Sequence, residues 1–391
     1  MACAQDRSER TGGEIVNNSR DDGGSGLAAD ALEDVLLGAC ILGVGGGGPR
    51  VLGESLLASV NKLGAPRIVM PDKVPDSARM AVSACAGSPT AAAIDPFPYD
   101  VATTAYRELA RLRGVSFDHV LAGELGAGNS FIPMLVAAQL GLPLVDASGA
   151  RRAMTTLPEA TFAADNVQIS PIVAADGKSK VVFSTDTAVQ ADPVMRAVMS
   201  SGTFPDFAGI AMWAMDGATM KRTAIGGTLA YAGALGAALR QARGKDPVEA
   251  VRAYLKGKVL FRGKIISATE QSAGGFDLGR MALQSADGKS QCTVYNQNEN
   301  LIAWSTQKAT PLGMGPDLLC WLTFDGEPFT NAPPDIAKYV QNPRQNLDKE
   351  VVLIGAPSLP QSRAASIVTA YMSILRQIGY AGPYVAIEDL P

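Results

Sequence analysis

Segments with apolar residues every three or four positions alternate with short, continuously apolar runs in the first part of the chain. The first pattern predicts amphipathic helices and the second predicts buried strands. The predicted helices lie at 27–43, 51–63 and 99–113, and the predicted strands at 67–70 and 80–87. Such alternation is typical of an α/β domain.

The segment that follows predicts a βαβ unit. Residues 119–123 form one strand candidate, 129–141 a helix of about three turns, and 142–147 a second strand candidate. Strands joined by such a short helical connection are parallel, with a right-handed crossover. This unit is expected to form part of a parallel sheet in the N-terminal domain.

The pattern changes again after residue 170. A hairpin is predicted at 170–185, turning at Asp176-Gly177, followed by helices at 192–202, 220–243 and 246–257. From Lys258 the chain alternates polar and apolar residues and is rich in β-branched and aromatic side chains, which is typical of strands. It closes with "EVVLIGAP", a helix at 362–379 and "PYVAIEDL".

These patterns predict an α/β plus β-rich fold: an N-terminal α/β domain with a parallel βαβ unit, and a C-terminal β-rich, barrel-like domain. The expected division is a disordered leader at 1–26, an α/β domain at 27–188, and a helical connection with the β-rich domain at 189–391. The β-rich domain is expected to end in a βαβ-like segment. The leader is polar and glycine-rich and lacks the apolar stretch of a signal peptide.

Composition narrows the function. The net charge is −4 without a basic run, which argues against nucleic acid and a polybasic membrane attachment. No apolar run reaches the ~20 residues that a membrane-spanning helix needs. The five cysteines are odd in number and form no CxxC pair, which favours a reducing, cytoplasmic setting. His119 is the single histidine, which excludes multi-histidine metal centres and any Ser-His-Asp triad that does not use it. Its position at the start of a predicted strand favours a packing or surface residue.

The glycine-rich sequence "GVGGGGPR" lacks the GK[ST] of a phosphate-binding loop and follows a predicted helix rather than a strand. No nucleotide is therefore expected. Consecutive glycines are retained where the backbone approaches something closely. Gly46 and Gly47 are candidates for substrate binding, and a purely structural turn is the alternative.

Two carboxylates follow the predicted strands of the βαβ unit. Glu124 comes just after the first strand and Asp146 at the end of the second. Ligands of parallel α/β sheets bind at these strand ends, so both carboxylates are candidates for acid–base catalysis or for holding a divalent metal. The alternative is that they cap turns or pair with Arg151 and Arg152.

Between these carboxylates, "GAGN" offers backbone amides at a helix N-terminus, suited to a developing negative charge. Gly126 and Gly128 are candidate binding residues. Asn129 is a candidate catalytic residue, with helix capping as its alternative. In the β-rich region, "NQNENLIAW" concentrates amides and a carboxylate, and Asn298 is a candidate substrate contact, with a plain β-turn as the alternative. Cys40 and Cys85 have apolar neighbours, more typical of core residues than of nucleophiles.

Several motifs together resemble the S-methyl thiohydantoin desulfurase family, from about Leu32 to the C-terminus. They occur in the family's order: "GACILGVGGGGP", "GELGAGNSFIPMLVAAQLGLPLVDASGARRAMTTLP", "NQNENLIAW", "PDLLCWLTFDGEP" and "GYAGPYVAIEDL". The resemblance implies an α/β domain followed by a β-rich one. It also implies a heterocyclic substrate, with hydrolytic loss of sulfur from C2 of a thiohydantoin ring.

The resemblance implies roles for the matching residues. Glu124 or Asp146 would activate water while the other carboxylate binds a ring N–H, and the amides of 126–129 would stabilise charge. Arg151 or Arg152 would hold a substrate carboxylate. The chain departs from the family pattern at Leu125 and Ser148, where the family usually has acids.

Those departures leave a second hypothesis open: a non-catalytic subunit or small-molecule-binding partner of a hydantoinase or oxoprolinase-type enzyme. A metal-dependent amidohydrolase acting on a cyclic imide is a third. The Gly- and Ala-rich segment 226–239 indicates close helix packing, and packing between copies of the chain in a homo-oligomer stays open.

Overall fold

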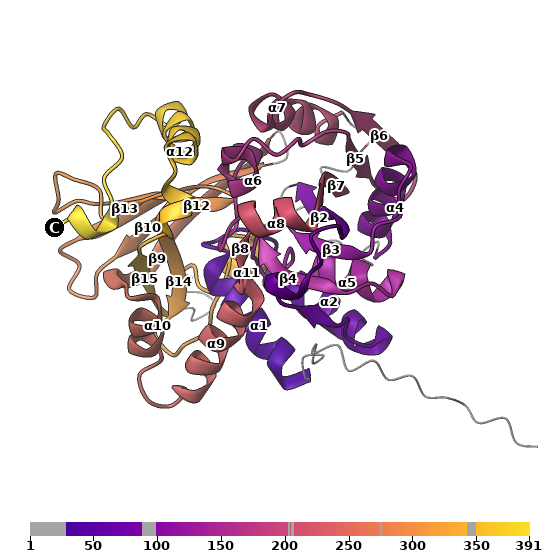
Figure 1. The fold of residues 1–391 in the computed structure, drawn as a ribbon. Coiled ribbons are helices and arrows are strands. Elements are labelled where there is room, and N and C mark those ends of the chain that lie inside the picture. The colour runs from indigo at the N-terminus through magenta and orange to yellow at the C-terminus, as the bar shows by residue number, and fades with distance from the viewer. Residues whose placement is uncertain (1–28, 88–98, 202–203, 205–206, 274–275, 342–348) are drawn as a thin grey trace, which may run out of the picture.

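The protein is built on two β-sheets joined through helices (Figure 1). The computed structural model describes residues 29–87, 99–201, 204, 207–273, 276–341 and 349–391. The predicted leader at 1–26 lies outside these residues. Across the described chain, the α/β plus β-rich fold class predicted from the sequence is confirmed.

The N-terminal sheet is mixed. Its order is β1-β4-β3-β2-β7-β5-β6, with β8 paired to β4. The first four strands run parallel and include the predicted βαβ unit, and the remaining pairings are antiparallel. The strands are β1 (Ile68–Val69), β2 (Arg79–Gly87), β3 (His119–Ala122), β4 (Leu144–Ser148), β5 (Ile172–Ala175), β6 (Lys180–Phe183), β7 (Phe207–Asp216) and β8 (Ile225–Gly226).

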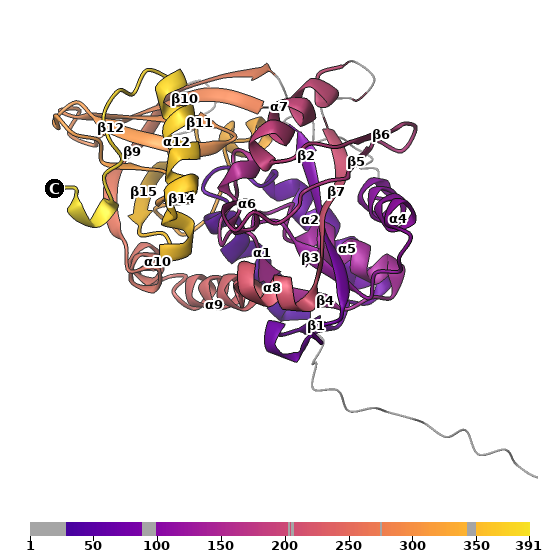
Figure 2. The same cartoon turned by 45° about the horizontal axis from the view of Figure 1, so that its top comes forward.

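Helices cover both faces of this sheet (Figure 2). Along β2, Ala81 packs into the cluster on one face, and Met80 and Val82 into the cluster on the other, as the period of two in a strand requires. One face is covered by α2 (Arg50–Leu63), α4 (Val101–Arg113) and α5 (Phe131–Leu140), and the other by α6 (Thr161–Ala164), α7 (Ala188–Met199) and α8 (Gly217–Thr223).

The C-terminal sheet is antiparallel, in the order β13-β12-β11-β10-β9-β15-β14. Its last strand, β14, also contacts β12 and β13, so the sheet curls into a nearly closed barrel around an apolar interior. The strands are β9 (Lys258–Ala273), β10 (Phe276–Gln284), β11 (Gln291–Gln297), β12 (Glu299–Ser305), β13 (Gly313–Met314), β14 (Leu318–Thr323) and β15 (Glu350–Ala356). The accompanying helices are α10 (Pro247–Leu255), α11 (Pro333–Ile336) and α12 (Ala365–Gln377).

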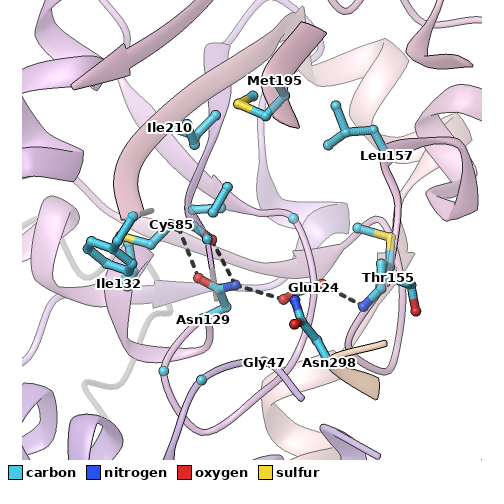
Figure 3. Close-up of a pocket in the computed structure, with 18 of the residues that line it drawn as sticks. Gly47, Cys85, Glu124, Asn129, Ile132, Thr155, Leu157, Met195, Ile210 and Asn298 are labelled. Carbon is cyan, nitrogen blue, oxygen red and sulfur yellow. Dashed lines mark hydrogen bonds between the residues drawn. The ribbon is translucent and has the colours of Figure 1, made fainter. Parts of the chain in front are cut away.

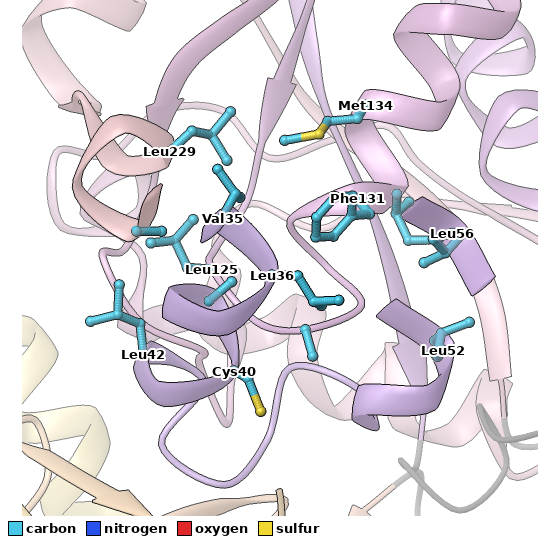
Figure 4. Packing of buried hydrophobic residues seen from close by; sticks show 14 of the residues in the cluster. Val35, Leu36, Cys40, Leu42, Leu52, Leu56, Leu125, Phe131, Met134 and Leu229 are labelled. Atoms are coloured by element: carbon cyan, nitrogen blue, oxygen red, sulfur yellow. The ribbon is translucent and has the colours of Figure 1, made fainter. Parts of the chain in front are cut away.

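The Gly- and Ala-rich segment forms α9 (Thr228–Gln241), and its small residues pack within the chain against α1 (Ala29–Leu42). A Cβ added to Gly38 would lie 1.8 Å from the carbonyl oxygen of Ala232, and one added to Gly236 would lie 1.8 Å from that of Asp34. Figure 4 shows the core that these helices share with α2 and the loop before α5. Close approach of the two helices thus explains the small side chains.

Three details differ from the sequence predictions. The helix expected at 220–243 is interrupted, because Gly227 adopts a left-handed conformation (φ 69°) and starts a new helix, α9. Strand β7, between β2 and β5, was not predicted: it is apolar on both faces and carries no period of two. After α12, residues 387–389 form a 3₁₀ turn, η4 (Ile387–Asp389), where the second strand of a βαβ-like segment was expected.

The glycine-rich loop between α1 and α2 joins the two sheets. The Gly47 carbonyl accepts hydrogen bonds from the amides of Gly128 (2.8 Å) and Asn129 (3.1 Å), on the loop after β3. From the other side, the amide of Asn300 donates to Val44 (2.7 Å) and that of Asn331 donates to Gly45 (2.7 Å). The loop is therefore a structural junction between the α/β sheet and the barrel.

Replacing Gly47 with Ala should destabilise the fold by about 3 kcal/mol or more. The new Cβ would lie 2.5 Å from the Cα of Gly126, at a backbone φ of 70°. Gly64 is a matched control, because its φ is also positive (88°) but nothing lies within 4 Å of an added Cβ. Gly64→Ala should cost only about 1 kcal/mol. Denaturant unfolding of both variants measures the difference, and equal losses would contradict a tight junction.

Candidate functional site

A pocket lies where the carboxyl ends of β2 and β3 meet the glycine-rich loop and the tip of the β11–β12 hairpin (Figure 3). Residues 154–157, α7 and β7 complete its wall. Its cavity volume is about 90 Å³, which is narrow beside the ~300–1,000 Å³ of pockets for drug-sized ligands and leaves room for a small group only. Polar groups of Glu124, Asn129 and Asn298 lie in the lower part of the pocket in Figure 3, and the apolar side chains of Met195, Ile210 and Leu157 lie above them.

Glu124 lies in this pocket, directly after β3, and is 7% exposed. Its Oε1 accepts a hydrogen bond from Nδ2 of Asn129 (2.7 Å), and its Oε2 accepts one from the amide of Met154 (2.6 Å). Burial raises the pKa of Glu124 to about 7, against the lowering effect of these two donors. The carboxyl is thus poised to exchange a proton near neutral pH.

Asn129 fixes the position of Glu124. Besides donating to the carboxylate, its side chain accepts from the amide of Cys85 (3.0 Å) and donates to the Cys85 carbonyl (3.1 Å). The amide therefore links the end of β2 to the loop after β3. The alternative role as the N-cap of α5 is not what the structure shows, because Ser130 occupies that position.

A second carboxyl reaches the pocket from the barrel. Glu299 begins β12, is 2% exposed, and accepts a hydrogen bond at Oε1 from the amide of Gly47 (3.3 Å). Burial, together with the charge of Glu124, raises the pKa of Glu299 to about 8. Asn298, at the hairpin tip with a φ of 57°, also lines the pocket. The two strands pair across this single residue, Gln297 with Glu299, so the hairpin tip is tight and forms part of the pocket wall.

Behind the pocket floor, one buried cation faces several acids. Arg152 is 2% exposed and donates through Nη1 to the carbonyls of Pro316 (2.7 Å) and Asp317 (3.0 Å). Glu159 accepts from the amide of Thr155 (2.8 Å), and burial raises its pKa to about 7 although the charge of Arg152 lowers it. The positive charge of Arg152 also favours the ionised forms of Glu124 and Glu299. It therefore offsets part of the cost of burying these acids.

Cys85 lines the same pocket, but burial raises the pKa of its thiol well above the usual range. The thiolate is the nucleophilic form, so the geometry does not favour a cysteine nucleophile. Cys40 is buried in the core, as expected from its apolar neighbours.

The structure brings together part of the predicted site. Five of the ten candidates line the pocket: Gly47, Glu124, Gly128, Asn129 and Asn298. Gly46 and Gly126 lie just behind, where a Cβ would meet Oε1 of Glu299 (2.0 Å) and the Cα of Gly47 (2.4 Å), respectively.

The other three candidates lie outside the pocket lining. Arg151 stacks on the ring of Tyr231 (3.8 Å to the centroid), and Arg152 is held by backbone carbonyls. Asp146 accepts hydrogen bonds from the amides of Leu229 (2.7 Å) and Ala230 (3.2 Å), so its carboxylate caps α9. Capping was the alternative left open for this residue, and the expected crevice shared with Glu124 is not formed.

Several residues that line the pocket were not among the candidates from the sequence, including Thr155, Arg196 and Glu299. Glu159, which lies next to the pocket, was not a candidate either. Only Glu299 left a signal: an acid at the start of an otherwise apolar strand, within an already noted group of amides. Glu124, the other carboxyl of the pocket, lies 175 positions earlier in the chain (299 minus 124), so no local pattern links the two residues.

Among the residues that the structure describes, no three His, Cys, Asp or Glu side chains are grouped so as to hold a metal ion. In the same residues no helix is long and apolar enough to cross a membrane.

Comparison with known proteins agrees with the sequence motifs. The S-Me-THD-like N-terminal domain matches residues 30–186, and the S-Me-THD-like C-terminal domain matches residues 186–366. The chain belongs to the S-methyl thiohydantoin desulfurase-like family. A crystal structure of a protein from Chromobacterium violaceum is similar, with 30% sequence identity and a TM-score of 0.78 over 93% of this chain and all of that one. No curated protein matches this chain.

The structure shows where the side chains of Leu125 and Ser148 lie, the two positions at which the chain departs from the motif of the resemblance. Leu125 is fully buried and packs in the core beside Leu36 and Val35 (Figure 4). Ser148 is also buried and donates to the carbonyl of Ala150 (2.8 Å). Neither position lines the pocket. The absence of acids at these two positions therefore removes no carboxyl from the pocket.

Asp146→Ala should destabilise the protein by about 1–2 kcal/mol, because two amides at the start of α9, one of them buried, lose their acceptor. Asp246→Ala is a control, since Asp246 caps α10 through a single amide in an exposed position; it should cost less. Thermal unfolding measures both. If folded Asp146→Ala failed to bind ligands that the wild type binds in the pocket, Asp146 would belong to the site.

Proposed function

We propose that this protein hydrolyses the exocyclic carbon–sulfur bond at C2 of a thiohydantoin or S-methyl thiohydantoin, releasing a hydantoin and sulfide or a thiol. The observation that carries the proposal is the buried carboxyl of Glu124, facing the pocket in a chain of the desulfurase-like family. The heterocycle would lie against the end of β3, where ligands of parallel sheets bind.

Glu124 would act as the general base. An attacking water would transfer a proton to this carboxylate as its oxygen bonds to C2. The hydrogen bonds from Asn129 and Met154 hold the carboxylate in place and leave each oxygen a further lone pair for that water. A pKa raised by burial makes Glu124 a stronger base than an exposed glutamate, while it is still ionised in part at neutral pH.

The pocket wall suits a sulfur substituent. Met195, Ile210 and Met212 present apolar or thioether groups, and such side chains pack favourably with a soft, weakly hydrated methylthio group. A thiolate leaves more readily than an alkoxide because it is the weaker base. The chain therefore needs no histidine to assist its departure.

Glu124→Gln should lower kcat for an S-methyl thiohydantoin by about 10²–10⁴-fold, because the amide keeps the hydrogen-bonding shape but cannot accept the proton of water. KM should change little. Release of thiol, followed with a thiol-reactive dye, measures the rate.

Glu33→Gln is the control, since Glu33 is an exposed glutamate on α1, and it should keep the wild-type rate. Turnover by folded Glu124→Gln at the wild-type rate would rule out this base. Tight binding of hydantoins by the wild type without any turnover would favour the non-catalytic, ligand-binding alternative.

A further inference from the structure

The Glu299 carboxyl has one oxygen without a partner inside the pocket wall. Its Oε2 is fully buried and makes no hydrogen bond with the residues that the structure describes. The Thr155 hydroxyl is close enough to interact with the carboxyl, although outside hydrogen-bonding geometry. Unsatisfied buried polar atoms are costly in native proteins, and the cost is lower for a neutral carboxyl than for a charged one.

The hairpin that carries Glu299 is locked in place. Asn298 accepts from the amide of Asp277 (2.7 Å), and Asn331 donates to the Asn298 carbonyl (2.8 Å) and to Oδ1 of Asn300 (3.0 Å). The amides of "NQNEN" thus build the turn, and the carboxyl between them is the group that faces the pocket. The Gly46 backbone makes room for it, since a Cβ there would lie 2.0 Å from Oε1 of Glu299.

Glu299 and Glu124 face one pocket of low polarity, and two like charges there would repel. The donors decide which of the two carries the charge. Glu124 receives hydrogen bonds of 2.7 and 2.6 Å, whereas Glu299 receives a single one of 3.3 Å. Glu124 is therefore the better-stabilised carboxylate, and Glu299 is the group that keeps its proton.

We propose that Glu299 is the general acid that protonates the ring nitrogen next to C2, opposite Glu124 as the base. This inference rests on the proposed function. In an S-methyl thiohydantoin C2 is doubly bonded to a ring nitrogen. In the first step water bonds to C2, the π pair of that C=N bond moves to the nitrogen, the water proton passes to Glu124, and the Glu299 proton passes to the same nitrogen. In the second step the C2–S bond breaks, sulfur takes the proton from Glu124, and the new hydroxyl on C2 returns a proton to Glu299. The products are the hydantoin and the thiol, and both carboxyls return to their starting state.

In this mechanism the active form of the pair has Glu299 protonated and Glu124 ionised. Other charged or titratable groups surround the pair. Arg152, Glu159 and Tyr371 of α12 interact with one or both carboxyls or with each other, and Cys85 and Arg196 line the pocket wall. Their effects are common to the wild type and its Glu299 variants, so a comparison of these proteins isolates the contribution of Glu299.

The test is the pH dependence of kcat/KM. The wild-type profile should be bell-shaped, falling below about pH 7 as Glu124 becomes protonated and above about pH 8 as Glu299 loses its proton. In Glu299→Gln the rate should drop about 10²–10⁴-fold, and the alkaline fall should disappear. Glu249→Gln, a change at an exposed glutamate of α10, should leave the profile unchanged. If Glu299→Gln keeps both the wild-type rate and the alkaline fall in kcat/KM, the proposal is wrong.

A measurement without turnover separates this inference from the proposed function. Difference infrared spectroscopy near pH 7.5, the midpoint of the two pKa values, should show the C=O stretch of a protonated carboxyl that is lost in Glu299→Gln. An unchanged band in that variant would show that Glu299 is not the protonated partner, and would overturn the inference. Failure of the wild type to turn over thiohydantoins would refute the proposed function while this spectroscopic result still stands.

Discussion

The contact between two glycine-containing loops determines the architecture of the site. Gly47 and Gly126 approach so closely that a Cβ on either would lie within 2.5 Å of the other's Cα. The same loop accepts hydrogen bonds from Asn300 and Asn331 of the barrel. Because the loop after β3 carries Glu124 and the barrel hairpin carries Glu299, this one junction sets how the two carboxyls face each other. The glycine run is therefore explained by packing between loops, without a phosphate ligand.

Burying several acids in one region costs free energy, and the structure limits that cost in two ways. Arg152 supplies a single positive charge behind Glu124, Glu159 and Glu299. The raised pKa values of the three glutamates mean that part of the remaining cost is avoided by keeping protons bound. The region can therefore hold and release protons near neutral pH, which a site with fully ionised or fully exposed carboxylates could not do.

Much of the fold follows from local patterns in the sequence. The βαβ unit, the hairpin at 170–185 and the β-rich second half were all recognised, because their period or turn residues are strong. Strand β7 was not, since a central strand that is buried on both faces resembles a buried helix segment in sequence. The break at Gly227 depends on an acceptor, Asp146, that lies far away in the chain.

The site was predictable only where it lies next to a strand end. Glu124 and Asn129 follow β3 directly, so the rule about carboxyl ends of parallel strands locates them. The same rule suggested Asp146, but the start of α9 uses that carboxylate as a cap. The local sequence does not distinguish Glu124 from Asp146. They differ because a distant segment, the start of α9, packs over the end of β4 at Asp146.

The two carboxyls of the pocket come from different sheets, Glu124 from the α/β sheet and Glu299 from the barrel. Leu125 and Ser148 stand where the resemblance implies acids, and both side chains lie away from the pocket. Changes there alter the packing beneath the site and leave its carboxyls in place. Glu299, by contrast, comes from a hairpin held by an amide network and lies against Gly46, where an added Cβ would displace its carboxyl. In the proposed mechanism, loss of this junction would leave Glu124 without the acid that Glu299 supplies. We therefore expect the proposed activity to depend on the barrel hairpin as much as on the motif after β3.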